Sequence, residues 1–242
     1  MMIKFLLISS LLVSVVYARA QSGVQSLYAD KIEYSCDTSF TVSLRSTKLR
    51  RAIAVQGTLK WDTTAVQYAG IFGGTSAVAL NESNMNLSGI TDGYLTFLWF
   101  DFNLTGIDMP DDSALFSIRF RRNGPGAGRG DVSFSNTPTP MEVDTLDVSG
   151  SPQKNNDIVY TSGYIVTPDI YVFNGAGSWG DASNWTRGRK PPATLPECSE
   201  VWVDPAGDAE CVMNSPFTVL PGARMQVIGN KRLRVNGNLI LQ

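Results

Sequence analysis

The chain has 242 residues, a formal net charge of −2 and an apolar fraction of 43%, which is enough for a globular core. The near balance of charges implies no strongly basic face, so we expect no nucleic-acid partner. The chain has no histidine, which removes the common general base and every histidine-containing metal site. No carboxylate lies in a recognisable catalytic motif either, so we expect a protein that is not an enzyme.

Residues 1–20 have the pattern of a secretion signal. Lys4 precedes the mostly apolar run Phe5–Val16, and Ala18-Arg19-Ala20 matches a cleavage site. The apolar run is too short to span a bilayer, and no later stretch could do so. We therefore expect a mature chain that begins at Gln21, has no transmembrane segment, and is secreted, extracellular or held at the cell surface.

From residue 21 to 168 the sequence predicts only strands and turns, because apolar and polar residues alternate in short runs. The expected strands are Ser26–Ala29, Phe40–Ser46, Ala52–Trp61, Val66–Ile71, Tyr94–Phe100, Ala114–Arg121, Asp131–Phe134 and Ile158–Val166. Residues 135–157 are rich in Pro, Thr, Ser, Asp and Asn and are expected to form a long loop. This pattern favours one all-β sandwich domain.

Alternation within two of these strands separates a core face from an outer face. Trp61 and Trp99 lie at the apolar positions of their strands and are expected in the core rather than as sugar-stacking platforms. The outer positions of the first strand are Ala54, Gln56, Thr58 and Lys60. Those of the second are Tyr94, Thr96, Leu98 and Phe100. The second set forms either an exposed apolar patch for protein docking or a surface covered by the loop after residue 135.

An acidic group follows the second strand, at Asp101, Asp108, Asp111 and Asp112. Several carboxylates near one turn could hold calcium, but we favour a solvated turn as the explanation of this group. We expect no other cofactor.

Residues 169–242 form a second, β-rich unit. Trp179 and Trp185 begin it, and we expect them to pack against its first strands rather than to bind sugar. Short strands are expected at Glu200–Asp204, Phe217–Leu220, Met225–Ile228, Leu233–Val235 and Asn238–Leu241. The close spacing is typical of stacked β-rungs. So short a stack leaves an open end that favours association, and we expect this unit either to be a fragment of a longer ancestor or to have a partner.

Three cysteines are present, and secretion would permit a disulfide. Cys198 and Cys211 flank a short strand and a turn, so we expect these two to be bridged. By the chain-entropy estimate such a bridge would stabilise the fold by about 3 kcal/mol. Cys36 is then left as a buried thiol or an intermolecular partner.

The order of motifs in the first domain resembles the cohesin domain of cellulosome scaffoldins. The matching segments are Phe40–Leu44, Gly57–Asp62, Val66–Tyr68, Gly93–Asp101, Ser113–Phe120 and Tyr160–Gly163. The resemblance implies a jelly-roll β-sandwich of about nine strands. It also implies a module that binds dockerin-like protein modules in extracellular polysaccharide-degrading assemblies. Related carbohydrate-binding modules share the fold, so a polysaccharide ligand is the neighbouring possibility.

The resemblance implies a partner-binding face made of Ala54, Gln56, Thr58, Lys60, Tyr94, Thr96 and Phe100. Dockerin-binding members carry Asn and Asp where this chain has Ala54 and Gln56. The C-terminal unit resembles the tryptophan-rich start of β-solenoids in Bacteroidetes-type surface proteins, through Gly177–Trp179, Ala182–Trp185, Gly188, Pro191 and Pro192. The alternative function is therefore a structural or adhesive surface protein, in which this unit is the functional part.

Overall fold

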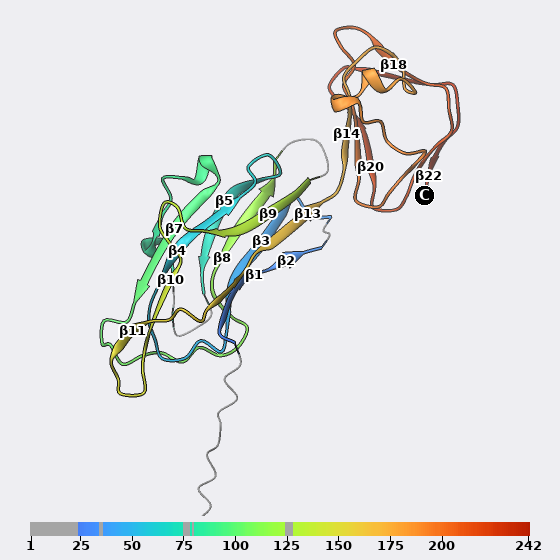
Figure 1. Ribbon diagram of the computed structural model, residues 1–242. Helices are drawn as coiled ribbons and strands as arrows, with labels where there is room; N and C mark the ends of the chain where they lie inside the picture. The colour runs from blue at the N-terminus through green and yellow to red at the C-terminus, as the bar shows by residue number, and fades with distance from the viewer. Residues whose placement is uncertain (1–23, 34–35, 75–77, 79, 124–127) are drawn as a thin grey trace, which may run out of the picture.

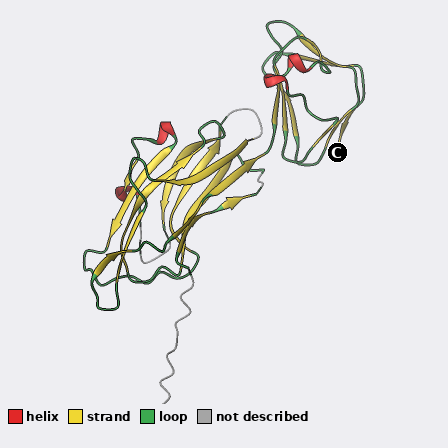
Figure 2. Ribbon diagram, in the orientation of Figure 1, coloured by secondary structure: helices red, strands yellow, loops and turns green. Residues whose placement is uncertain are grey.

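The computed structural model describes residues 24–33, 36–74, 78, 80–123 and 128–242. The expected secretion signal, residues 1–20, lies outside the described residues. Figure 1 shows a larger unit of two facing sheets and a smaller unit of three short sheets. Strands dominate both units, as Figure 2 shows, and the all-β prediction is confirmed. The helical segments are the 3-10 turns η1 (Glu82–Asn84), η2 (Ile90–Asp92), η3 (Ala182–Asn184) and η4 (Thr186–Gly188).

The first sheet of the sandwich has the strand order β12-β1-β3-β8-β5. Its strands are β12 (Val159–Thr161), β1 (Ser26–Ala29), β3 (Ser39–Thr47), β8 (Ser113–Arg122) and β5 (Val66–Gly73). All neighbours are antiparallel except β1 and β12, which are parallel.

The second sheet is built around β4 (Ala52–Trp61). Its main path runs β11-β10-β4-β9-β13-β2, while β7 pairs with β4 and β6 pairs with β7. These strands are β11 (Pro152–Lys154), β10 (Glu142–Leu146), β9 (Gly128–Ser135), β13 (Gly163–Thr167), β2 (Lys31–Ile32), β7 (Tyr94–Phe100) and β6 (Met85–Asn86). β10 and β9 pair with successive halves of β4, and β7 pairs with β4 from Ala54 to Lys60.

The core lies between the two sheets, where the apolar positions of their strands meet. Phe116 and Phe120 of β8 are fully buried against Leu59 and Leu95 of the second sheet. Trp61 is buried and packs edge-on against Phe120, with ring centroids 5.3 Å apart. Trp99 is partly buried and packs against the same core. Both tryptophans therefore lie where the alternation predicted.

The prediction of a long loop over residues 135–157 was wrong in part, because this segment contains the strands β10 and β11. The polar composition of the segment hides a short alternation, in which Met141, Val143 and Thr145 are buried. Met141 packs where β4 carries Gly57, since a Cβ at Gly57 would meet the Met141 sulfur. The strand expected over Ile158–Val166 is two strands, and they belong to different sheets.

The C-terminal unit is a stack of short parallel strands on three faces. The three sheets have the orders β14-β17-β20, β15-β18-β21 and β16-β19-β22. The first rung in chain order is β14 (Ile170–Phe173), β15 (Gly177–Ser178) and β16 (Thr194–Leu195). The middle rung is β17 (Glu200–Val203), β18 (Glu210–Met213) and β19 (Phe217–Val219), and the last is β20 (Arg224–Val227), β21 (Arg232–Val235) and β22 (Leu239–Leu241). The strand Glu210–Met213 was not among those predicted.

Two tryptophans close the first end of this stack. Trp179 and Trp185 are buried, and their rings meet edge-on with centroids 4.7 Å apart. The Trp185 indole donates to the Trp179 carbonyl at 2.8 Å, and the ring also packs edge-on against Phe173. The expectation that they pack against the first strands is confirmed.

The predicted Cys198–Cys211 disulfide was wrong, since the structure pairs Cys198 with Cys36. The Cα atoms of Cys36 and Cys198 are 4.8 Å apart, within the range that a disulfide spans. Cys211 is a free, buried cysteine, because its position in β18 points into the stack. Burial raises the pKa of the Cys211 thiol to about 12.

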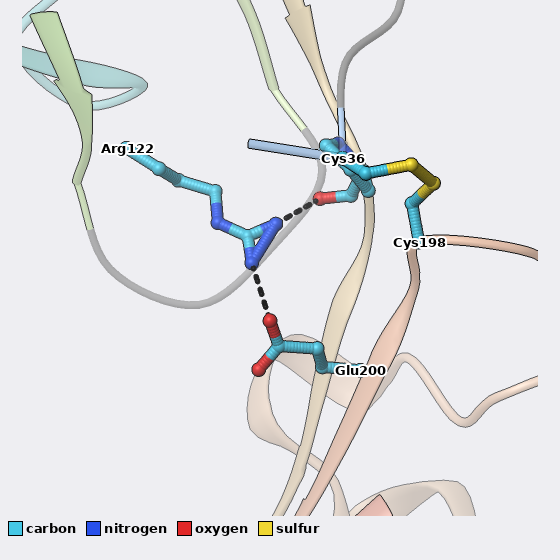
Figure 3. Close-up of a disulfide and its surroundings, with 5 residues drawn as sticks. Cys36, Arg122, Cys198 and Glu200 are labelled. Atoms are coloured by element: carbon cyan, nitrogen blue, oxygen red, sulfur yellow. Dashed lines mark hydrogen bonds and ion pairs between the residues drawn. A yellow bond between two sulfur atoms is a disulfide. The ribbon is translucent and has the colours of Figure 1, made fainter. Parts of the chain in front are cut away.

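The disulfide lies beside an ion pair that also joins the two units, as Figure 3 shows. Arg122 at the end of β8 pairs with Glu200 at the start of β17, with a nitrogen–oxygen distance of 3.3 Å. Arg122 also donates to the Pro168 carbonyl at 3.1 Å. A covalent link and a shielded ion pair thus connect the sandwich to the C-terminal stack.

Candidate docking surface

The outer faces of β10, β4 and β7 present one continuous set of side chains. Cross-strand register places Phe100 opposite Ala54 and Leu98 opposite Gln56. Directly opposed residues on one face of a sheet lie close enough for their side chains to contact one another. Ala54 is small and only partly buried, so it leaves the ring of Phe100 accessible.

Four apolar side chains stand out from this surface, and we call them the apolar patch: Leu98, Phe100, Phe102 and Leu104. Their exposed fractions are 48%, 44%, 84% and 57%. The rings of Phe100 and Phe102 contact one another, with centroids 4.1 Å apart and planes tilted by 52°. Apolar side chains gathered in this way on a folded surface mark an interaction site more often than chance exposure.

Asp101 fixes the loop that carries half of the apolar patch. Its buried carboxylate accepts from the backbone N–H groups of Asn103, Thr105 and Gly106 at 3.0, 2.9 and 3.0 Å. Burial alone would raise the pKa of Asp101, but these bonds and the Thr105 hydroxyl hold the pKa below its ordinary value.

Leu104 has a backbone φ of 49°. This left-handed conformation is disfavoured for leucine and occurs chiefly where the surroundings impose it. The Leu104 N–H donates to the Asp101 carbonyl at 3.1 Å. The exposed leucine is therefore held in place by the same residue that orders the rest of the loop.

Of the seven residues expected to bind a partner, Phe100 belongs to the apolar patch, and Ala54 and Gln56 lie beside it, opposite Phe100 and Leu98. The side-chain amide of Gln56 donates to the carboxylate of Glu142 in β10, with a nitrogen–oxygen distance of 3.4 Å. Lys60 lies at the other end of β4, where it donates to the Thr137 hydroxyl at 3.3 Å.

Thr58 is fully buried and is a correction to the expected contact set. Its hydroxyl donates to the Thr139 carbonyl at 2.7 Å and accepts from the Thr139 N–H at 2.9 Å. The segment after residue 135 therefore covers this end of the face and leaves the Phe100 end open.

Tyr94 and Thr96 lie away from the open end, and both are partly buried. The Tyr94 ring packs on Gly89, where a Cβ would lie 2.2 Å from the ring. Thr96 is paired with Asn86 of β6. Neither residue joins the apolar patch.

Phe102 and Leu104 were missed by the sequence reasoning, because both lie after the predicted end of the strand at Phe100. A signal was present, since two large apolar residues alternate with Asn103 and Thr105 immediately after an aspartate. Aspartate often folds the backbone that follows it by accepting its N–H groups.

An acidic edge flanks the face on β10. Glu142 and Asp144 lie opposite Gln56 and Ala54, and Lys154 of β11 pairs with Glu142 at 3.3 Å. Burial and the neighbouring Glu142 raise the pKa of Asp144 above its ordinary value, and Lys154 partly offsets this.

The aspartates considered as calcium ligands accept hydrogen bonds from different donors and do not converge on one point. Asp108 accepts from the Arg51 N–H at 2.8 Å, Asp111 from the Lys48 N–H at 2.6 Å, and Asp112 from the Tyr28 hydroxyl at 2.6 Å. Within the described ranges, three potential ligand side chains come together only at Cys36, Glu197 and Cys198, and two of these are joined in the disulfide.

These observations define the class of the molecule: a two-sheet β-sandwich with an exposed apolar patch, linked to a small stack of parallel strands. No family model and no curated protein matches the sequence. No helix in the described part of the chain is long and apolar enough to cross a membrane.

Solved structures that resemble the chain are cohesins, the family that the strand motifs resemble. The seventh ScaB type I cohesin from Pseudobacteroides cellulosolvens is 13% identical, with a TM-score of 0.49 over 60% of this chain and 93% of that chain. The sixth cohesin of Acetivibrio cellulolyticus scaffoldin B, in complex with a Cel5 dockerin mutant, is 16% identical, with a TM-score of 0.46 over 59% and 98%. A non-cellulosomal cohesin from Archaeoglobus fulgidus is 12% identical, with a TM-score of 0.42 over 60% and 91%. Likeness at this level establishes no function, which has to be inferred from the chain's own residues.

Proposed function

We propose that the protein is a secreted, non-catalytic binding module that docks a dockerin-like protein module on the apolar patch. The observation that carries the proposal is the exposure of Leu98 and Phe100 on β7 and of Phe102 and Leu104 in the loop that follows it. Aromatic side chains at the centre of an interface commonly supply most of the binding free energy. The Asp101 bonds hold the loop in place before binding, which lowers the entropy cost of association.

The geometry favours a protein partner over a polysaccharide. Phe100 and Phe102 are tilted by 52° relative to each other and are flanked by two leucines. They form an uneven aliphatic and aromatic surface, which suits apolar side chains better than the flat face of a sugar ring. The flanking acidic edge at Glu142 and Asp144 would favour a partner with basic groups beside its apolar centre.

The extracellular setting rests on the secretion signal expected over residues 1–20 and is supported by the Cys36–Cys198 disulfide. The resemblance of the strand motifs to cohesins suggests a role in polysaccharide-degrading assemblies. In that setting the sandwich would span residues 21–168, and residues 169–242 would form a separate unit carried beside it.

The test is a quantitative pull-down of the mature protein from the secretome of its own organism. The bait variants are Gln56→Ala, Phe100→Ala and the double variant Phe100→Ala/Phe102→Ala. Phe72→Ala is the matched control, because Phe72 is 40% exposed but lies on β5 of the opposite sheet. We expect the patch variants to lose the captured protein while Phe72→Ala keeps it. Equal capture by all variants would contradict the site, and capture of polysaccharide alone would contradict the protein partner.

The second candidate function is adhesion through the C-terminal stack, which is favoured by the exposed apolar residues of its last strand. Removing residues 169–242 separates the two functions. Surface attachment that is lost while sandwich binding persists would support adhesion.

A further inference from the structure

The outer face of the first sheet of the sandwich carries two arginines in line on β8. Arg119 and Arg121 are exposed, and they alternate with the buried residues Ile118 and Phe120. Residues two apart on a strand point to the same face and lie about 7 Å apart. Because β8 lies between β3 and β5 in this sheet (Figure 1), the two cations stand on the face of the sheet and not at its edge.

The positive charges of these two arginines are not compensated by acidic neighbours. Within the described residues, neither guanidinium forms an ion pair or a hydrogen bond. None of the residues opposite them on the neighbouring strands is acidic; these are Thr41 and Gly70 for Arg119, and Ser39 and Gln67 for Arg121. Farther along β3, in contrast, Arg45 pairs with Asp30 at 2.8 Å. The Arg119 end of the face is therefore positive in a chain whose formal net charge is −2.

The guanidinium of Arg119 is held in place without the use of its N–H groups. Its central carbon lies over the ring of Phe72 in β5, 4.5 Å from the ring centroid. Stacking of this kind orients the guanidinium plane and leaves the donors around its edge free. Gly70 lies opposite Arg119 on the same side, and even an added Cβ there would meet no atom within 4 Å. The edge of the guanidinium is therefore open to a planar anion.

The rest of this surface suits a hydroxyl-rich chain better than a protein. Ser39, Thr41 and Gln67 are exposed, and their side chains form no hydrogen bond within the described part of the chain. The surface lacks the apolar centre typical of protein interfaces, since Phe72 is partly covered by Arg119.

Strand addition by a peptide is also prevented at this place. Both edges of β8 are paired, with β3 on one side and β5 on the other, and β3 is paired in turn with β1. No backbone group of the two strands in the middle of this surface is left to extend the sheet. The ligand therefore has to bind through side chains, as hydroxyl and carboxylate groups do.

We propose that this face binds a polysaccharide built of uronic acid units. Arg119 and Arg121 would each donate hydrogen bonds to a carboxylate of the chain, and the planar guanidinium can donate two parallel bonds to one carboxylate. The sugar hydroxyls would bond to Ser39, Thr41 and Gln67. The site lies on the sheet opposite the apolar patch, so it is independent of protein docking there.

The test titrates the full mature chain with oligogalacturonate and with the same oligosaccharide fully methyl-esterified, which keeps the ring hydroxyls but has no charge. Oligoglutamate of equal charge probes an acidic peptide as the occupant. The variant is Arg119→Gln/Arg121→Gln. Its control is Arg129→Gln/Lys154→Gln, which removes the same charge from two exposed cations of the second sheet. Each protein is checked for an unchanged melting temperature.

We expect oligogalacturonate to bind the wild type, and the methyl ester and oligoglutamate to bind at least tenfold more weakly. Arg119→Gln/Arg121→Gln should weaken the binding of oligogalacturonate at least tenfold, while the control variant leaves it unchanged. No binding of oligogalacturonate, equal binding of its methyl ester, or an equal loss in both variants would overturn the proposal. So would equally tight binding of oligoglutamate, because an acidic peptide would then fit the face as well. Capture of a protein by the apolar patch is measured separately, so the two proposals can fail independently.

Discussion

Among single residues, Asp101 makes the most hydrogen bonds to the loop of the proposed docking surface. Its buried carboxylate gathers three backbone N–H groups and the Thr105 hydroxyl. The loop that results projects Phe102 and Leu104 into solvent. The Asp101 side chain thus holds the backbone from which two of the four apolar residues project.

Replacement of Asp101 by asparagine should weaken docking without removing an apolar contact. The amide keeps one acceptor oxygen, but its NH₂ group meets N–H donors and cannot satisfy them. We expect affinity for the captured partner to fall about tenfold, as when a supporting residue is lost from an interface, together with a lower melting temperature.

The pH dependence of this effect follows from the lowered pKa of Asp101. A carboxyl group with a lowered pKa in the folded state stabilises the fold above its unfolded pKa and loses that contribution as the pH falls through the folded pKa. The difference in melting temperature between wild type and Asp101→Asn should therefore be full at pH 7 and shrink below about pH 4. A difference that stays constant down to pH 2 would contradict the role of the charge.

At the scale of elements, β4 is covered unevenly by the segment that follows β9. The Thr58–Thr139 bonds close one end of the outer face, while the end beside Phe100 stays open. The alternation of β4 and β7 was sufficient to predict both strands with their bounds and to place both tryptophans. It could not predict which outer residues are covered, because the covering segment is distant in sequence.

β10 shows why part of the sheet was not predicted. Its five residues, Glu142–Leu146, include two acids and a threonine, and turn-forming residues surround them. The strand is stabilised by pairing with β4 and by burial of Val143, so tertiary contacts outweigh its weak local preference.

Thr58→Val tests whether this covering segment is structural rather than part of the docking surface. Valine has the same shape but leaves the Thr139 N–H and carbonyl without partners, at a cost of about 1–3 kcal/mol. We expect a lower free energy of unfolding by denaturant and an unchanged affinity for the partner. A large loss of affinity with unchanged stability would restore Thr58 as a contact residue.

At the scale of the whole molecule, the Cys36–Cys198 disulfide and the shielded Arg122–Glu200 ion pair join the two units. The pairing of Cys36 with Cys198 spans 162 residues, and no local spacing could have revealed it. Proximity in sequence favoured Cys211 instead, but strand alternation in β18 directs that thiol into the stack. The existence of two units, in contrast, follows from the change in composition near residue 168.

Peptide mapping without reductant checks this connection. We expect Cys36 and Cys198 in one linked peptide and Cys211 free, with Cys211 alkylated only after unfolding because its thiol is buried. Cys36→Ser should lower the melting temperature, since closing a loop of this length contributes on the order of 5 kcal/mol by the chain-entropy estimate. A Cys198–Cys211 peptide would contradict the structure.

The most direct measurement is a calorimetric titration of the captured partner into wild type, Phe100→Ala/Phe102→Ala and Phe72→Ala. All three proteins should have the same melting temperature, since these side chains lie at the surface. The docking surface predicts that the double variant binds at least tenfold more weakly, a loss of about 1.4 kcal/mol or more, while Phe72→Ala binds like wild type. Equal affinities for wild type and the double variant would show that the partner binds elsewhere.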